Sequence, residues 1–217
     1  MIKERIKGLV FDMDNTLLKS NINFIAMKSD VYAFLTGHRV ISPDTRVDEH
    51  TTATLIEMAR LSDLFDEDMS RTVWHIVRDH EMKGMSDAKL QPHVEEVLGM
   101  LSKYYYLTVL TNNAYDAAES ALGRNGIFHL FNLVVGREQV PNLKPSPAGV
   151  LHILNMYPAL AKENWLCTGD SWIDGRAALD AGLSFISYRG DIAKMNEKGI
   201  YPLLNIQDMT RLLDILL

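Results

Sequence analysis

The fold of this chain is indicated most clearly by the residues Gly8-Leu9-Val10-Phe11-Asp12-Met13-Asp14-Asn15-Thr16. Its first four residues are uncharged and mostly apolar, which is typical of a strand that is buried on both faces of a parallel sheet. Asp12 ends this run, and Asp14 follows two residues later. Two carboxylates directly after a buried strand are costly unless a cation lies nearby. The stretch therefore predicts a first strand that delivers acidic groups to one edge of a sheet.

Similar short runs recur along the chain and predict further strands. They cover residues 106–110, 133–135, 165–167 and 185–188, and stretches with helical periodicity separate them. Helices are expected from Pro92 to about residue 101, at 114–122, from Pro147 to about 154, at 173–179 with Gly182 as the end signal, and at 206–217. This alternation predicts an α/β fold with a parallel sheet flanked by helices.

One segment breaks the alternation of strands and helices. Residues 18–84 contain no convincing strand, whereas 52–60 and 69–80 carry apolar stripes at helical spacing. A crossover between parallel strands needs only one helix, so we expect a separate helical block inserted after the first strand. The predicted organisation is a first core segment at 1–17, a helical cap at 18–85 and a second core segment at 86–217.

The composition excludes several classes of protein. The 217 residues include 22 Lys and Arg against 28 Asp and Glu, which gives a formal net charge of −6. This acidic balance argues against a nucleic-acid partner. No apolar run is long enough for a membrane span, and the N-terminal residues lack the apolar stretch of a signal peptide. The single cysteine, Cys167, is expected to be a small buried apolar residue, and the predicted location is the cytoplasm.

Reactive side chains follow the predicted strands. Active sites of open parallel sheets lie outside the carboxyl ends of the strands, so these positions are the first candidates. The second predicted strand ends in Thr111-Asn112-Asn113, Lys144 follows the third, and Gly169-Asp170-Ser171-Trp172-Ile173-Asp174 follows the fourth. A similar acidic cluster, Asp66-Glu67-Asp68, precedes a helical stripe instead and is expected to complement a helix N-terminus.

These four segments, in this order and spacing, resemble the four signature motifs of the haloacid dehalogenase superfamily of phosphotransferases. The resemblance covers residues 8–18 and about 91–190. Lys144-Pro145-Ser146-Pro147 and the Asp170 segment look especially like the phosphoglycolate phosphatase branch, which carries a helical cap. The resemblance implies a Rossmann-like core with such a cap inserted after the first motif.

The resemblance also implies a role for each motif residue. Asp12 would be the nucleophile that forms an aspartyl-phosphate, and Asp14 would be the general acid for ester cleavage and then the general base for water. Lys144 would offset the negative charge of nucleophile and phosphate. Thr111 would bind the phosphoryl group, helped by the backbone N–H groups of Asn112 and Asn113.

A magnesium ion is the cofactor that the resemblance implies. The ion would be held by Asp12, the backbone carbonyl of Asp14 and Asp170. Asp174 would either bind the ion as a further ligand or contact one of the residues that bind it. Such oxygen-only ligation suits Mg²⁺. The expected substrate is a small phosphomonoester such as phosphoglycolate, a sugar phosphate or a nucleotide phosphate.

Alternative functions are weighed on particular residues. Dehalogenases of the same fold lack an acid at the place of Asp14, which favours phosphate hydrolysis. A sugar-phosphate mutase resembling beta-phosphoglucomutase stays open, as does a binding protein without turnover. The chain has no HExxH, GxSxG or GxxxxGK[ST] motif, so metalloprotease, serine hydrolase and P-loop kinase are excluded. Cap residues considered for substrate contact, although a solvated surface is favoured for each, are Asn21, Asn23, Lys28, Arg39, Arg46 and His50.

Overall fold

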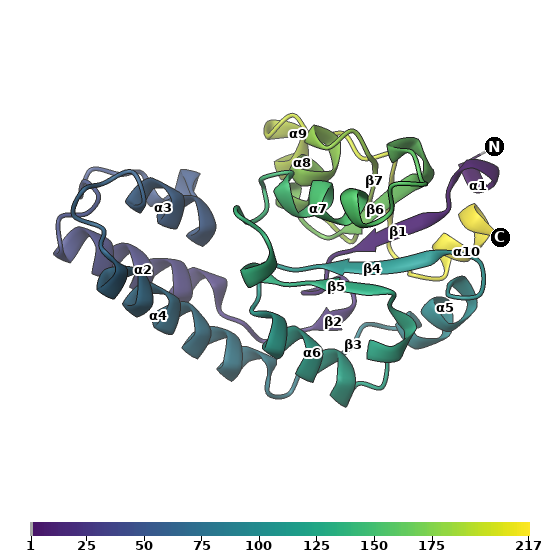
Figure 1. Ribbon diagram of the computed structural model, residues 1–217, viewed down its shortest axis with the longest axis horizontal. Helices are drawn as coiled ribbons and strands as arrows, with labels where there is room; N and C mark the ends of the chain where they lie inside the picture. The colour runs from purple at the N-terminus through teal and green to yellow at the C-terminus, as the bar shows by residue number, and fades with distance from the viewer. Residues whose placement is uncertain (1) are drawn as a thin grey trace. The chain divides into compact units, whose positions relative to one another are not determined.

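The computed structural model describes residues 2–217, with side chains from Glu4 onward, and divides them into two compact units. The first unit comprises the residues up to Ser20 together with Ala88–Leu217, and the second comprises Asn21–Asp87. A six-stranded sheet forms the centre of the first unit, in the order β5-β4-β1-β6-β7-β8 (Figure 1). All neighbouring strands pair in parallel, which confirms the predicted α/β fold. The strands are β1 (Gly8–Phe11), β4 (Tyr106–Leu110), β5 (Leu133–Val135), β6 (Trp165–Gly169), β7 (Ser184–Tyr188) and β8 (Leu204–Ile206).

The pairing register brings three strand ends together. Strand β1 lies between β4 and β6, and its last residue, Phe11, pairs with Val109 on one side and with Thr168 on the other. Parallel strands all end at the same edge of a sheet. The residues that follow these three neighbouring strands therefore meet at one edge, and they include Asp12, Thr111 and Asp170.

Helices cover both faces of the sheet. Figure 1 shows α7, α8 and α9 together on one face and α5 and α6 on the other. Helix α8 packs on β6 and β7, whereas α6 packs on β5. The helices of this unit are α1 (Ile2–Arg5), α5 (Val94–Leu101), α6 (Tyr115–Arg124), α7 (Ala148–Met156), α8 (Trp172–Asp180), α9 (Ile192–Glu197) and α10 (Arg211–Leu216), with short 3₁₀ turns at Phe128–Leu130, Arg137–Gln139 and Lys162–Asn164.

The second unit consists of helices. They are α2 (Phe24–Gly37), α3 (Thr52–Ala59) and α4 (Glu67–Met85), with a 3₁₀ turn at Val47–Glu49. Helix α2 packs against both α3 and α4. The carboxylate of Asp66 caps the first turn of α4 by accepting a hydrogen bond from Met69 N, so this acidic cluster does mark a helix start.

One strand of a short antiparallel pair precedes the second unit along the chain, and the other strand follows it. Strands β2 (Leu18–Lys19) and β3 (Lys89–Leu90) pair with each other within the first unit. The unit boundaries follow Ser20 and Asp87, so they lie three and two residues beyond the boundaries expected at 17 and 85. No strand was expected at Leu18, because a strand of two residues leaves no recognisable pattern in a sequence.

The C-terminal part of the chain differs from its predicted structure. Residues 206–217 were expected to be helical, yet Ile206 ends strand β8 and the helix starts only at Arg211. Asp208 causes part of this difference, because its carboxylate accepts hydrogen bonds from the backbone and side chain of Thr210 and forms a turn. Helix α6 also runs through Gly123, and the glycine with left-handed backbone follows at Gly126 (φ 75°).

The core of the first unit packs closely around β1 and β6. A Cβ atom on Gly8 would come within 2.4 Å of the Trp165 ring, so this strand position has room only for glycine. Cys167 is buried in the same cluster, as expected. Among the described residues, no helix has the length and apolar character needed to cross a membrane.

Candidate active site

The turn after β1 aims the side chain of Asp12. Leu17 and Leu18 both donate backbone hydrogen bonds to the Met13 carbonyl, and Asn15 takes a left-handed backbone conformation (φ 60°), which asparagine tolerates better than most residues. Within this turn the Thr16 hydroxyl donates to Asp12 Oδ2 at 2.8 Å. The Asp12 carboxylate is therefore fixed on one side by its own turn.

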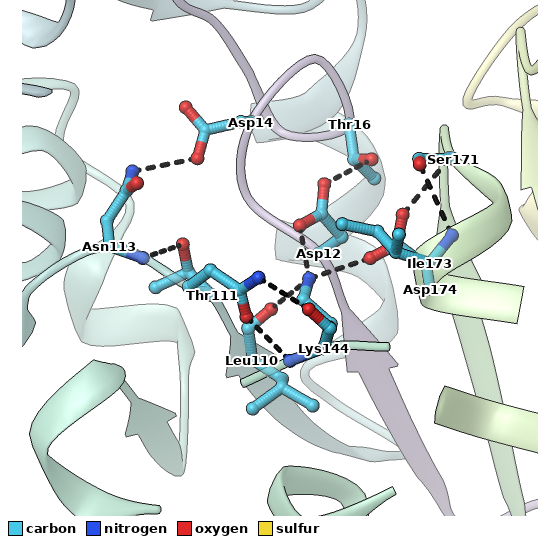
Figure 2. Close-up of polar contacts among 11 residues, drawn as sticks. Asp12, Asp14, Thr16, Leu110, Thr111, Asn113, Lys144, Ser171, Ile173 and Asp174 are labelled. Atoms are coloured by element: carbon cyan, nitrogen blue, oxygen red, sulfur yellow. Dashed lines mark hydrogen bonds and ion pairs between the residues drawn. The ribbon is translucent and has the colours of Figure 1, made fainter. Parts of the chain in front are cut away.

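Lys144 fixes the other side of Asp12. Its ammonium group donates to Asp12 Oδ1 at 2.6 Å, to Asp174 Oδ1 at 2.7 Å and to the Leu110 carbonyl at 2.9 Å (Figure 2). These three bonds use all three donors of the buried amine. Burial alone would lower the pKa of Lys144, but the charges of Asp12 and Asp174 outweigh it and raise that pKa above its ordinary value. Lys144 therefore stays a cation between two carboxylates.

Asp174 comes from the first turn of α8. Its Oδ2 accepts a hydrogen bond from Ser171 N at 3.1 Å, so it closes a capping box with Ser171. Gly169 makes room for it, because a Cβ there would come within 2.5 Å of the Asp174 side chain. Burial and the charge of Asp12 raise the pKa of Asp174 to about 6, against the opposing effect of Lys144. Both oxygens of this carboxylate are thus engaged by the protein itself.

Asp170 is the acid of this edge whose charge is least compensated. Burial, then the charges of Asp12 and Asp174, raise the pKa of Asp170 to about 8. One ligand atom from each of Asp12, Asp170 and Asp174 lies within 4.8 Å of the others. An oxygen-only set of this size suits Mg²⁺, which is usually held by one or two carboxylates together with waters and phosphate. The donor set therefore fits the implied magnesium ion, with Asp12 and Asp170 as the principal carboxylates.

Asp14 lies on the same turn but faces different partners. Asn113 Nδ2 donates to Asp14 Oδ2 at 2.8 Å, and Figure 2 shows these two side chains facing one another. Asp14 Oδ1 is buried and has no hydrogen-bond partner among the described residues. Burial, reinforced by the charge of Asp12, raises the pKa of Asp14 to about 7. The Asp14 carboxyl group therefore keeps its proton to a higher pH in the protein than it would in water.

The three residues after β4 are held by internal bonds. Thr111 is buried and its hydroxyl accepts a hydrogen bond from Asn113 N at 3.1 Å. The Asn112 side chain pairs with the backbone of Lys144 in both directions, donating to its carbonyl and accepting from its N–H, each at 2.9 Å. Both asparagine side chains therefore contact the residues expected to do chemistry, which the predicted role of their backbone N–H groups did not include.

Sequence reasoning missed three further contributors to this site. Thr16 was not predicted to contact Asp12. It follows Asp12 by four residues across a turn, and this spacing could have indicated the contact. Gln91 lies 76 residues from Asn15 yet donates from its side chain to the Asn15 carbonyl at 3.1 Å. Ser171 supplies the N–H that holds Asp174. No sequence pattern could have indicated the contact of Gln91.

Several polar residues of the second unit have structural roles. Asn23 caps α2 by accepting a hydrogen bond from Ala26 N, and Lys28 donates to the carbonyls of Val47 and His50 at 3.0 and 3.1 Å. Arg46 forms an exposed pair with Glu49. These contacts lie within the second unit. They explain the presence of Asn23, Lys28 and Arg46 without a contact to substrate.

The fold is of the α/β class, and a cluster of aspartates lies at the carboxyl edge of its parallel sheet. Comparison with known proteins identifies its family, because the family model described as haloacid dehalogenase-like hydrolase matches residues 9–188. The chain belongs to this family, and the predicted superfamily and the class of phosphatase-type hydrolase are confirmed.

Relatives and a solved structure agree with this assignment. The chain is 27% identical over 187 residues to phosphoglycolate phosphatase from Vibrio cholerae, covering 82% of this chain and 81% of the relative. It is 27% identical over 179 residues to pyrophosphatase PpaX from Listeria monocytogenes, covering 82% and 80%. A haloacid dehalogenase-like family hydrolase from Streptococcus pneumoniae has the same fold, with a TM-score of 0.67, 21% identity and coverage of 99% and 100%.

Proposed function

We propose that the protein is a Mg²⁺-dependent phosphatase that hydrolyses a small phosphomonoester through an aspartyl-phosphate on Asp12. The observation that carries this proposal is the buried Lys144 ammonium bound to both Asp12 and Asp174, with the Asp170 carboxylate beside them. The predicted partner is a small phosphorylated metabolite rather than a nucleic acid. The predicted cytoplasmic location stays a prediction.

Asp12 is oriented for nucleophilic attack. Lys144 and Thr16 hold its two oxygens, so the carboxylate has little freedom to turn. In the first step an Asp12 oxygen forms a bond to phosphorus while the bond between phosphorus and the ester oxygen breaks. The protonated Asp14 gives its proton to the departing alkoxide, which leaves as an alcohol.

The second step returns the enzyme to its starting state. The Asp14 carboxylate takes a proton from water, whose oxygen attacks phosphorus and releases inorganic phosphate from Asp12. Lys144 stabilises the negative charge in both steps, because its ammonium lies against the reacting carboxylate. Thr111 is proposed to bind the phosphoryl group together with the backbone N–H of Asn112, because the N–H of Asn113 already donates to the Thr111 hydroxyl.

The magnesium ion would be held by Asp12, the Asp14 backbone carbonyl and Asp170. Asp174 would contribute through its contact with Lys144 and with the other ligands of the ion. When bound, this ion offsets the charge of the phosphoryl oxygens and of the clustered carboxylates. Without a cation, burial and the charges of the neighbouring carboxylates oppose the ionisation of Asp170, and its pKa is raised for this reason. The site and the ion thus complement each other.

A panel of phosphate esters tests the proposal. Purified protein should release phosphate from at least one of phosphoglycolate, sugar phosphates, nucleotide phosphates, pyrophosphate or an aryl phosphate when Mg²⁺ is present, and chelation should stop the release. Asp12→Asn should abolish it. A sugar 1-phosphate that isomerises without net phosphate release would instead support a mutase. Equal inactivity of wild type and Asp12→Asn over the whole panel would support a binding protein.

A further inference from the structure

Asn113 is held in place by three separate contacts at the carboxyl edge of the sheet. It is buried, with 3% of its surface exposed. Its backbone N–H donates to the Thr111 hydroxyl, and its carbonyl accepts from Arg137 N at 2.9 Å. Burial restricts the orientations of its side chain. Its amide donates to Asp14 Oδ2 at 2.8 Å, 99 residues away in sequence.

The two oxygens of Asp14 have different surroundings. Oδ2 accepts the hydrogen bond of Asn113, whereas Oδ1 is buried without a partner in the described part of the chain. The Ser20 hydroxyl lies close enough to favour the charge of Asp14 but makes no hydrogen bond of normal geometry. The Asn113 bond therefore engages one oxygen and leaves Oδ1 without a hydrogen-bond partner in the described part of the chain.

The neighbouring Asn112 makes an independent set of contacts. Its side-chain amide forms two hydrogen bonds of 2.9 Å with the Lys144 backbone, which resemble the reciprocal bonds between paired strands. Because Lys144 extends from this backbone to Asp12 and Asp174, the position of its ammonium depends on where that backbone lies. Asn112 thus contacts Lys144, and Asn113 contacts Asp14.

We propose that this asparagine pair positions two reacting groups of the site: Asn113 directs Asp14 Oδ1 toward the leaving group, and Asn112 sets the place of the Lys144 ammonium. This inference rests on the proposed phosphatase function and adds two positioning residues to it. Neither asparagine side chain takes part in bond making. Each acts through the group that its amide holds.

The two roles have different kinetic consequences. Asp14 matters most when the leaving alkoxide needs a proton, and an aryl oxide leaves with little protonation. Lys144 stabilises negative charge whatever the leaving group is. Loss of the Asn113 contact should therefore slow the first step selectively for alkyl phosphates, whereas loss of the Asn112 contact should slow that step for alkyl and aryl phosphates alike.

The experiment compares kcat/KM, which reports formation of the aspartyl-phosphate and not its later hydrolysis, for glycerol phosphate and para-nitrophenyl phosphate at saturating Mg²⁺ in Asn113→Leu and Asn112→Leu. Leucine keeps the branched shape of asparagine, with a somewhat larger volume, but cannot hydrogen-bond. Asn113→Leu should lower kcat/KM for the alkyl ester by about tenfold more than for the aryl ester. Asn112→Leu should lower both by the same factor, about tenfold. Asn113→Ala and Asn112→Ala replace either variant if its melting temperature shows that it does not fold.

Asn125 provides the matched control. It is an asparagine of the same unit, and its side chain also donates to two carbonyls, those of Ala88 and Ala121. It contacts none of the site residues in these bonds, so Asn125→Leu should lower stability without changing the ratio of alkyl to aryl kcat/KM. Equal slowing of both esters by Asn113→Leu, or unequal slowing by Asn112→Leu, would overturn the corresponding assignment.

A crystal structure of Asn113→Leu separates failure of this inference from failure of the proposed function. The Asp14 carboxylate should turn away from its wild-type position in that variant, and Lys144 should stay in place. An unmoved Asp14 would overturn the inference whether or not the protein hydrolyses any ester. Absence of phosphate release by wild type, with a displaced Asp14 in the variant, would refute the proposed function and retain the positioning role of Asn113.

Discussion

Replacing Lys144 by methionine removes the only cation in direct contact with Asp12 and Asp174 in the described structure. The Lys144 ammonium is 2.6 Å from Asp12 Oδ1 and 2.7 Å from Asp174 Oδ1, and its side chain is 4% exposed. At an effective dielectric constant of about 20, each contact has a Coulomb energy of roughly 6 kcal/mol. The cost of burying the charges offsets most of it, and removing one partner of such a buried set costs about 3–5 kcal/mol.

This loss should be visible as a change in the free energy of unfolding. For a chain of this size, about 3–5 kcal/mol corresponds to a fall in melting temperature on the order of 10 °C. Urea denaturation of the metal-free protein measures the difference directly. Lys103→Met is the control, because Lys103 is exposed and its removal should change stability by less than about 0.5 kcal/mol.

The pH dependence of the loss gives a second check. Lys144 has a folded pKa above its ordinary value, so its contribution is fully present at neutral pH and disappears only above about pH 10. Asp174 titrates at about 6 beside Lys144 and higher without it. Lowering the pH to about 5 protonates this carboxyl group in both proteins, so the deficit of Lys144→Met should shrink there. A deficit below about 1 kcal/mol, or one that is equal at about pH 5 and pH 8.5, would refute this reasoning.

Three further outcomes follow from the same contacts. Mg²⁺ should raise the melting temperature more at about pH 8.5 than at about pH 5, because Asp170, with a pKa raised to about 8, must lose its proton to bind the ion; an equal shift at both pH values would contradict this. Thr16→Val should lower kcat for phosphate release by about tenfold, since Asp12 Oδ2 loses its donor, whereas Thr72→Val in the second unit should leave kcat unchanged; unaltered kcat in Thr16→Val would exclude a positioning role. Gly8→Ala should destabilise the fold by about 1–3 kcal/mol in urea denaturation because its Cβ would overlap the Trp165 ring, while Gly99→Ala, which has open space, should not; similar stability of both would contradict the packing around β1.

Sequence patterns predicted the parts of the fold that depend on local apolar order. The run that ends at Asp12 and the strand at 106–110 were found because continuous apolar residues between turn signals mark buried parallel strands. Strand β8 was missed, since Leu204 and Asn205 are exposed and three residues show no periodicity. Its place at the sheet edge depends on tertiary packing, which a local pattern does not contain.

The candidate site shows the same division between local and long-range information. Asp12, Thr111 and Asp170 could be predicted from the ends of the strands, because parallel strands bring their carboxyl ends to one edge of the sheet. The bonds from Asn113 to Asp14 and from Asn112 to Lys144 span 99 and 32 residues. Such contacts depend on how side chains meet after folding, so residue spacing could not predict them.

Trapping the covalent intermediate is the strictest test of Asp12 as the nucleophile. Asp14→Asn should still accept phosphate from an aryl ester but should hydrolyse the aspartyl-phosphate slowly, so acid quenching during turnover should preserve it. Peptide mass spectrometry is predicted to find the phosphoryl group on Asp12 in this variant and in no peptide of Asp12→Asn. A phosphoryl group on another residue, or phosphate release that continues in Asp12→Asn, would contradict the account.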